Sequence, residues 1–505
     1  MHTGKVSEYI KTRKPIKDHR TTMILYQVLA SLQGAVVKSL QQTLSWVAFP
    51  MTIEPTNLPP VLRGDSVMHM QHEIAKSFSV GAEHGSFFVA DLSSVVQQHR
   101  RWKHFLPEIR PFYAIKCNPD PVVLHLLAGL GACFDCASLA EINMALAALG
   151  PSYRATDPST QGQRIIFASP CKFSSDIRGA ARLGIMMSTF DNMDELDKIA
   201  QHYPASRLVL RILADDSRSH WPLSRKYGAH LAVVPSLLKR AKELGLDVIG
   251  VSFHAGSGCS DPTIFADSVA RARKAFDIGK ELGYKFTLLD IGGGFEDKLM
   301  PDSDVNLFEE NARVLKGAIA EYFPVADRPK EFEVIGEPGR FYATNAFTLV
   351  TNIIARRAVI PGVNFVQPNI PVPGKEGAAV AELMLYLSDG TYGGLNNVLL
   401  DRKIAIPFVI AKDQSFSVPD EEKEPASIWG PTLDSIDCVN PWAMVPRGLG
   451  VGDWLGFKNM GAYTLCGVTK FNGFDASRVL YTTGAQEDGE QAWKILGKNC
   501  GMSLE

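Results

Sequence analysis

The stretch that decides the fold is residues 111–340, which opens with Pro-Phe-Tyr-Ala-Ile-Lys116. Within it, short apolar runs alternate with amphipathic segments, a pattern typical of alternating strands and helices. Eight repeats in about 230 residues favour a TIM-type (β/α)8 barrel over a doubly wound sheet, which usually has about five or six strands. The predicted strands are 112–115, 133–135, 165–167, 185–188, 208–212, 248–253, 287–291 and 332–335. The clearest predicted helices are 139–149, 235–244, 264–282 and 308–322.

Polar residues stand where the predicted strands end. In a (β/α)8 barrel the carboxyl ends of the strands form the mouth in which the active site is built. We therefore expect one catalytic mouth that contains Lys116, Asp135, Ser169, Arg211, His254, Gly292 to Gly294, Glu337 and Arg340.

Lys116 and two glycine clusters indicate the kind of cofactor. A lysine with little water around it is a candidate Schiff-base nucleophile because desolvation favours its neutral amine, although a plain salt-bridged lysine is an open alternative. The clusters at 292–294 and 336–339, with Arg340 beside the second, are either tight turns or a cradle of backbone N–H groups for a phosphate. A lysine and a phosphate cradle on one rim together suggest pyridoxal phosphate.

After Arg340 the pattern changes to short β-rich runs at 346–354, 408–411 and 454–457, which predicts a second, all-β domain. We divide the chain into an N-terminal extension (1–50), a segment that joins the β-domain (51–91), the barrel (92–345) and the β-domain (346–505). The polar, proline-bearing stretches 361–377 and 412–428 are expected to be surface loops.

Composition narrows the class of function. The 505 residues are 46% hydrophobic and 21% charged, and 52 Lys and Arg against 54 Asp and Glu leave a formal net charge of −2. This balance gives no reason to expect nucleic acid or a membrane as a partner, so a small molecule is expected. Eight scattered cysteines indicate a reducing, cytoplasmic compartment. Cys133 and Cys136 match half a zinc site, but no second pair follows, so we expect buried strand cysteines and no metal.

Residues 1–50 contain seven Lys and Arg but only Glu8 and Asp18 as acids. This allows a mitochondrial presequence, although an appendage to a fold that begins near Met51 is the simpler interpretation. The stretch 21–37 is too short and too polar to predict a membrane span.

A series of motifs occurs in order between Phe87 and Phe474. They include Phe-Tyr-Ala-Ile-Lys116-Cys-Asn, Phe-Asp135-Cys-Ala-Ser, Leu-Arg211-Ile, Phe-His254-Ala-Gly-Ser257-Gly-Cys, Asp290-Ile-Gly-Gly-Gly294-Phe, Gly-Glu337-Pro-Gly-Arg340, Ser-Asp389-Gly-Thr-Tyr-Gly, Gly-Pro-Thr-Leu433-Asp434 and Gly-Ala-Tyr463-Thr. This order of motifs resembles the eukaryotic-type ornithine decarboxylases, which have the alanine-racemase-like fold of pyridoxal phosphate enzymes. The resemblance implies a decarboxylase with a cofactor-binding barrel and a C-terminal β-domain.

The resemblance also implies a role for each matched residue. Lys116 would hold the cofactor covalently, Glu337 would keep its pyridine nitrogen protonated, and His254 would stack on its ring. The phosphate would be held by Ser257, Gly294, Arg340 and Tyr463. Two further residues, Asp135 and Arg211, would support the pocket. In the family the site is completed across a twofold dimer, so a homodimer is implied.

Two departures from the family concern the substrate. Where the family has a cysteine that returns a proton to the substrate's α-carbon, this chain has Leu433, and the nearby Cys438 is expected to be a core residue. Where the family has Tyr-Asp-His, this chain has Leu400-Asp401-Arg402. The two aspartates expected to bind a distal ammonium, Asp401 and Asp434, are both present. A diamino acid is therefore the expected substrate, in a more apolar pocket.

Three functions follow as hypotheses. The first is a pyridoxal phosphate-dependent carboxy-lyase acting on ornithine, lysine or a modified diamino acid, in polyamine or secondary metabolism. The second is a changed outcome, in which decarboxylation ends in transamination of the cofactor or in reaction with oxygen because the cysteine is lost. The third is a non-catalytic paralogue that binds regulators of polyamine synthesis. A decoy has no reason to keep Lys116, Glu337, His254 and the phosphate cradle, so we prefer the first.

Overall fold

The computed structural model describes residues 58–59, 61–64, 66–80, 85–151, 153, 163–300, 303–359, 381–412, 415, 422–484 and 486–500. The expected N-terminal extension 1–50 and the expected surface loop 361–377 lie outside the described residues. Within the described ranges, no helix is both long enough and apolar enough to cross a membrane.

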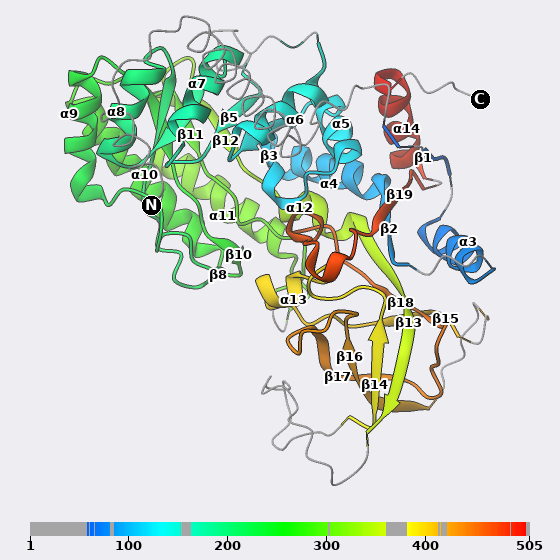
Figure 1. Ribbon diagram of the computed structural model, residues 1–505. Helices are drawn as coiled ribbons and strands as arrows, with labels where there is room; N and C mark the ends of the chain where they lie inside the picture. The colour runs from blue at the N-terminus through cyan, green and yellow to red at the C-terminus, as the bar shows by residue number, and fades with distance from the viewer. Residues whose placement is uncertain are drawn as a thin grey trace, which may run out of the picture. The chain divides into compact units, whose positions relative to one another are not determined.

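Eight parallel strands close into a barrel in the order β11-β12-β3-β4-β5-β6-β7-β9. The barrel region is coloured from cyan through green in Figure 1. The strands are β3 Ile109–Ala114, β4 Cys133–Cys136, β5 Ile165–Phe167, β6 Met187–Phe190, β7 Arg207–Arg211, β9 Asp247–Ser252, β11 Leu288–Asp290 and β12 Glu333–Gly336. The predicted barrel is confirmed. β3 begins earlier than predicted because Arg110, which interrupts the apolar pattern, is paired with Glu333 of β12 and covers the ring of Phe112 at 5.4 Å.

One buried side chain from each strand packs into a single cluster of the barrel. Its members are Phe112, Cys133, Ile166, Met187, Val209, Ile249, Leu288 and Ile335. This apolar layer fills the interior along the strands, so a polar site is left to the strand ends, as in other barrels of this type. The burial predicted for Cys133 and Cys136 is confirmed.

Helices alternate with the barrel strands along the chain. One of them, α6 (Leu139–Leu149), follows Ser138, whose hydroxyl oxygen accepts a hydrogen bond from the Glu141 N–H at 3.2 Å. The apolar face of α6 is buried at the three-residue spacing of Ile142, Ala145 and Ala148. The other helices are α3 Val67–Val80, α4 Leu92–Phe105, α5 Pro121–Gly129, α7 Ser174–Leu183, α8 Met193–His202, α9 Val234–Glu243, α10 Thr263–Glu281, α11 Leu307–Tyr322, α12 Arg340–Ala343, α13 Asn397–Leu400 and α14 Glu487–Cys500.

The chain after Arg340 is mainly β-structure, as predicted. A nine-stranded sheet has the path β1-β19-β2-β13-β14-β16-β17, and β18 pairs with both β13 and β15. Its strands are β1 Val61–Leu62, β2 Phe87–Asp91, β13 Phe347–Ala358, β14 Leu383–Leu387, β15 Phe408–Ala411, β16 Lys423–Trp429, β17 Cys438–Pro446, β18 Trp454–Phe457 and β19 Arg478–Thr482. A separate pair is formed by β8 Ser219–Trp221 and β10 Ser257–Cys259.

The expected surface loop 412–428 is wrong over its last six residues, 423–428, which belong to β16. The polar start of β16 hides its strand pattern, but Ala426 and Ile428 are fully buried between β14 and β17.

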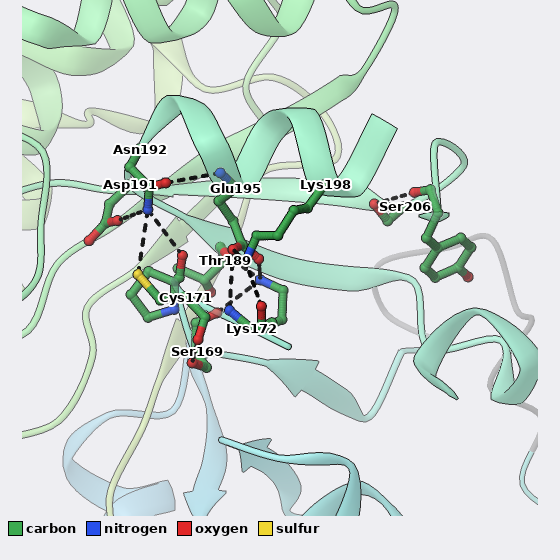
Figure 2. A network of polar contacts seen from close by, with 11 residues as sticks. Ser169, Cys171, Lys172, Thr189, Asp191, Asn192, Glu195, Lys198 and Ser206 are labelled. Atoms are coloured by element: carbon green, nitrogen blue, oxygen red, sulfur yellow. Dashed lines mark hydrogen bonds and ion pairs between the residues drawn. The ribbon is translucent and has the colours of Figure 1, made fainter. Parts of the chain in front are cut away.

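Figure 2 shows a buried ion network that joins the end of β5 to α8. The Lys172 side chain is 1% exposed, and its Nζ lies 2.9 Å from Glu195. The same ammonium donates to the carbonyl oxygens of Ser169 (2.9 Å) and Thr189 (2.7 Å). Burial lowers the pKa of Lys172, and Glu195 opposes this by favouring the charged amine. Ser169, which we expected at the catalytic mouth, belongs to this network instead.

Candidate active site

A cavity of about 470 Å³ opens at the carboxyl ends of the barrel strands. This volume is typical of sites that enclose a small molecule. The barrel contributes the predicted site residues Lys116, His254, Ser257, Gly294, Glu337 and Arg340 to the wall. The chain after the barrel contributes Leu400, Asp401, Tyr463 and Cys466.

Lys116 lies on the 3-10 turn η2 (Ile115–Cys117), directly after β3. Because β3 and β4 pair with Ala114 opposite Asp135, the buried Asp135 carboxylate forms an ion pair with Lys116. Burial acts to lower the pKa of Lys116, but the attraction of Asp135 and Glu337 outweighs it and raises the pKa. In the ligand-free protein Lys116 therefore matches the salt-bridged alternative that the sequence left open. Asp135 keeps the amine charged and holds it at the cavity wall.

Two buried carboxyl groups, Asp290 at the end of β11 and Glu337 after β12, lie close enough that each affects the protonation of the other. The backbone supports both, because Gly292 donates its N–H to Asp290 at 2.9 Å and accepts from the Glu337 N–H at 2.7 Å. Desolvation raises the pKa of Asp290 to about 7 and raises that of Glu337 as well. The pair therefore retains a proton near neutral pH, next to the cavity that Glu337 lines.

His254 presents a neutral imidazole to the cavity. Its Nδ1 accepts a hydrogen bond from the Gly256 N–H at 3.0 Å, which places the proton of the neutral ring on Nε2. Burial, reinforced by the charges of Arg211 and Lys116, lowers the pKa of His254 well below its ordinary value. An uncharged flat ring at this position can pack face to face with an aromatic ligand.

Arg340 organises one end of the cavity. Its Nε donates to the Ser257 hydroxyl at 2.9 Å, and its guanidinium carbon lies 4.3 Å from the centre of the Tyr463 ring. Its two terminal nitrogens donate to both carboxylate oxygens of Asp401 at 2.6 and 2.7 Å. Gly294, with a φ of +113°, brings the glycine loop to the same cavity.

Asp401 therefore lines the cavity as expected, but with its carboxylate already engaged. Besides Arg340, it accepts a hydrogen bond from Trp221 Nε1 at 2.9 Å, and Lys403 Nζ lies 4.0 Å away. Leu400 beside it is 60% exposed and provides an apolar wall.

Besides Ser169 and Asp135, which acts on the site through Lys116, three predicted residues do not line the cavity of the single chain. Arg211 ends β7 near it, where its charge acts on His254, and stacks 5.4 Å from the Tyr227 ring. Leu433 is 94% exposed, and its N–H donates to Asn472 at 3.0 Å. Asp434 accepts a 2.5 Å hydrogen bond from the Tyr392 hydroxyl, which lowers the pKa of Asp434.

Residues 92–344 match the family model of the pyridoxal-dependent decarboxylase, pyridoxal binding domain. Ornithine decarboxylase from Neurospora crassa is 43% identical over 81% of this chain and 83% of that protein. The chain belongs to the ornithine decarboxylase family. Antizyme inhibitor 2 from Xenopus laevis is 41% identical over 88% of this chain and 90% of that protein. The arginine decarboxylase of Paramecium bursaria Chlorella virus, solved with agmatine, superposes with a TM-score of 0.69 at 31% identity, over 82% of this chain and 100% of that one.

The cavity of this ornithine decarboxylase family member fits pyridoxal phosphate. It presents an amine at Lys116, a protonated carboxyl pair that includes Glu337, the flat ring of His254 and an arginine. A Cβ on Gly293 would lie 2.8 Å from His254 Nε2, and one on Gly294 would lie 2.9 Å from the Gly256 carbonyl oxygen. Only glycine lets the loop pass this close, so the backbone itself forms the wall beside Arg340.

Three residues of the site were not assigned a role from the sequence. Asp290 was visible only as part of the glycine motif, while Trp221 and Cys466 gave no local signal, because neither stands at the end of a barrel strand. Cys438, in contrast, is buried in β17 as expected, and desolvation raises the pKa of its thiol to about 12.

Proposed function

We propose that this protein is a pyridoxal phosphate-dependent decarboxylase of ornithine or a related diamino acid, releasing CO2 and a diamine of the polyamine type. The observation that carries the proposal is the convergence of Lys116, Glu337 and His254 with the cradle around Arg340 in one cavity. When bound, pyridoxal phosphate supplies an electron sink for the pair of electrons left on the α-carbon as CO2 departs.

Each residue of the proposed site has a separate role in binding or orienting the cofactor. Lys116 provides the amine that holds the cofactor, and Asp135 orients that amine. The proton shared by Asp290 and Glu337 keeps the pyridine nitrogen protonated. His254 supports the ring, and Ser257, Arg340, Tyr463 and the backbone at Gly294 bind the phosphate dianion.

We further propose that the working unit is a homodimer. Asp401 lies inside the cavity, whereas Leu433 and Asp434 lie on an exposed loop outside it. A second copy that placed this loop over the cavity would complete a site with two carboxylates for the distal ammonium, and it would cover the exposed Leu433. Arg340 would then be shared between the phosphate and Asp401.

Two observations support other outcomes. Leu433 has no proton to donate, which favours a reaction that ends in transamination or in reaction with oxygen. The 41% identity to antizyme inhibitor 2 favours a regulatory, non-catalytic role. The retained Lys116, Glu337 and His254 argue against that role.

The test is an absorbance spectrum of the purified protein followed by a turnover screen. Bound cofactor on Lys116 absorbs near the visible range, and Lys116→Ala should lose both this band and activity. The control is Lys226→Ala, at an exposed lysine outside the cavity lining, which should keep both. The screen measures CO2 and amine from ornithine, lysine, arginine and alkylated diamino acids. A protein without the band, or with the band but without CO2 release, contradicts the proposal.

A further inference from the structure

The proposed reaction consumes one proton, because hydrogen replaces the carboxylate on the α-carbon. This inference rests on that proposed function. Leu433 cannot donate a proton, so the donor must be another group that faces the substrate. The titratable groups that line the cavity in the described part of the chain are Lys116, His254, Glu337, Arg340, Asp401, Tyr463 and Cys466.

Cys466 is the thiol in this wall. It lies on the 3-10 turn η6 (Leu465–Gly467), three positions after the cradle residue Tyr463, and its side chain is open to solvent. Its S–H points to the carbonyl oxygen of Cys117 at 3.8 Å, and Cys117 directly follows Lys116. The thiol is therefore placed beside the residue that holds the cofactor amine, on the cavity side of the turn.

The turn that carries Cys466 is fixed from two sides. Tyr463, in the left-handed region with a φ of 55°, donates its N–H to the Cys117 carbonyl at 2.9 Å. On the other side, the Asn396 side-chain amide donates to the Thr464 carbonyl at 2.6 Å, and a Cβ on Gly467 would lie 3.0 Å from that same amide. A left-handed non-glycine residue persists only where the surrounding structure holds it. This support preorganises the thiol, as catalytic groups require.

The other groups of the wall are poorer proton donors or are already engaged. Asp401 is paired with Arg340, and Glu337 serves the pyridine nitrogen in the proposed function. Arg340 does not give up its proton, and His254 stands neutral because burial and neighbouring cations lower its pKa. Lys116 is committed to the cofactor and to Asp135. Tyr463 lies under the Arg340 guanidinium, and desolvation raises its pKa from an already high ordinary value of about 10.

The Cys466 thiol is protonated at neutral pH, and a cysteine thiol is more acidic than the side chains of tyrosine and lysine. An ordinary cysteine has a pKa of about 8.5, lower than that of tyrosine or lysine. Solvent reaches Cys466 through the cavity, yet the protein atoms around the sulfur desolvate it and raise its pKa, so the thiol is protonated at neutral pH. A general acid works best when its pKa lies near the operating pH, because it is then protonated and still acidic enough to give up its proton.

We propose that Cys466 is the catalytic proton donor of this decarboxylase. The S–H bond breaks, the electron pair left by CO2 forms the new C–H bond, and the resulting thiolate takes a proton from water before the next turnover. The net reaction is loss of CO2 from the amino acid and gain of one proton, with no oxidant or reductant.

The first test is thiol labelling, which does not depend on activity. The protein is treated with N-ethylmaleimide before and after loading with pyridoxal phosphate and a diamine, and the labelled peptides are identified by mass spectrometry. We expect loading to protect Cys466 and to leave Cys171, an exposed cysteine outside the cavity, equally reactive. Equal labelling of Cys466 in both states would overturn the assignment.

The second test compares Cys466→Ala and Cys466→Ser with Cys171→Ala. We expect both Cys466 variants to keep the cofactor absorbance, to lose about 100-fold or more in kcat, and to release less than one amine per CO2, while the control behaves as wild type. If the alanine variant does not fold, the serine variant and the labelling decide the question.

The two proposals fail in different ways. An active wild type whose kcat and amine yield survive Cys466→Ala overturns the role of Cys466 alone. A wild type that binds pyridoxal phosphate but releases no CO2 overturns the proposed function, and the assignment of Cys466 with it.

Discussion

Arg340 and Asp401 form a bidentate ion pair at the cavity wall, with nitrogen–oxygen distances of 2.6 and 2.7 Å and side chains that are 8% and 6% exposed. The pair joins the end of the barrel to the segment that follows α13. The same guanidinium donates to Ser257 and covers Tyr463, so four residues expected to serve the phosphate or the substrate form one connected group. Asp401 is thereby both a wall of the substrate space and a support for Arg340.

This pairing predicts a cofactor-dependent effect of Asp401→Ala. Removal of one partner of a buried ion pair costs about 3–5 kcal/mol, because the other charge is left unpaired. A bound phosphate dianion would give Arg340 a new partner, so we expect the variant to lose more stability without pyridoxal phosphate than with it. Urea denaturation with and without the cofactor measures both losses, with Asp304→Ala at an exposed position as a surface control. Equal losses in the two states would show that Arg340 does not hold the phosphate.

Asp434→Ala tests the substrate's distal ammonium. We expect the variant to raise KM for a diamino acid roughly 30-fold more than for an analogue without the distal amine, since a lost ammonium partner in a partly dry pocket costs about 2–5 kcal/mol. Tyr392→Phe is the matched control, because it removes the 2.5 Å hydrogen bond to Asp434 but leaves the carboxylate. A similar change for both substrates would make Asp434 structural.

The variant Leu433→Cys tests whether Cys466 already supplies the proton in the wild type. If Cys466 is the donor, the substitution should leave about one amine per CO2 in the otherwise wild-type enzyme, and it should raise the amine yield in the Cys466→Ala background. The measurement is the ratio of amine to aldehyde plus pyridoxamine phosphate. A clear rise in amine yield from Leu433→Cys alone would mean that the wild type lacks an efficient proton donor. Decarboxylation would then end in transamination of the cofactor or in reaction with oxygen.

The carboxyl pair predicts a pH dependence of stability. The pKa of Asp290 is raised to about 7 in the folded protein from an ordinary value of about 3.9, so the folded state keeps a proton that the unfolded state releases. The contribution of this proton to stability is fully present below about pH 4 and is lost as the pH rises to about 7. We expect Asp290→Asn, which stays neutral, to flatten the stability profile of the cofactor-free protein in this window.

Urea midpoints from pH 4 to 8 provide the measurement, and the exposed Asp304→Asn should leave the profile unchanged. A profile of Asp290→Asn that is parallel to wild type would show that the proton is held elsewhere.

Local sequence was sufficient for the barrel and for most of its mouth. The alternation of strand and helix is a property of neighbouring residues, and Lys116, His254 and Glu337 each stand one or two positions beyond a strand. Parallel strands of a closed barrel end on one side, so the order of these residues along the chain already predicted that they meet. The errors fell where the local pattern was ambiguous, at the start of β3, in β16 and at Ser169.

Tertiary structure alone decided the charge state of Lys116 and the presence of Asp401 and Cys466 in the cavity wall. Cys466 and Cys117 are separated by 349 positions, and Arg340 and Asp401 by 61, so no spacing rule connects them. The sequence could show that Lys116 is a lysine at a strand end, but its charge depends on Asp135 and Glu337 from two other strands. Desolvation and Coulomb attraction act through space, and their balance at an ionisable group is therefore set only when the chain has folded.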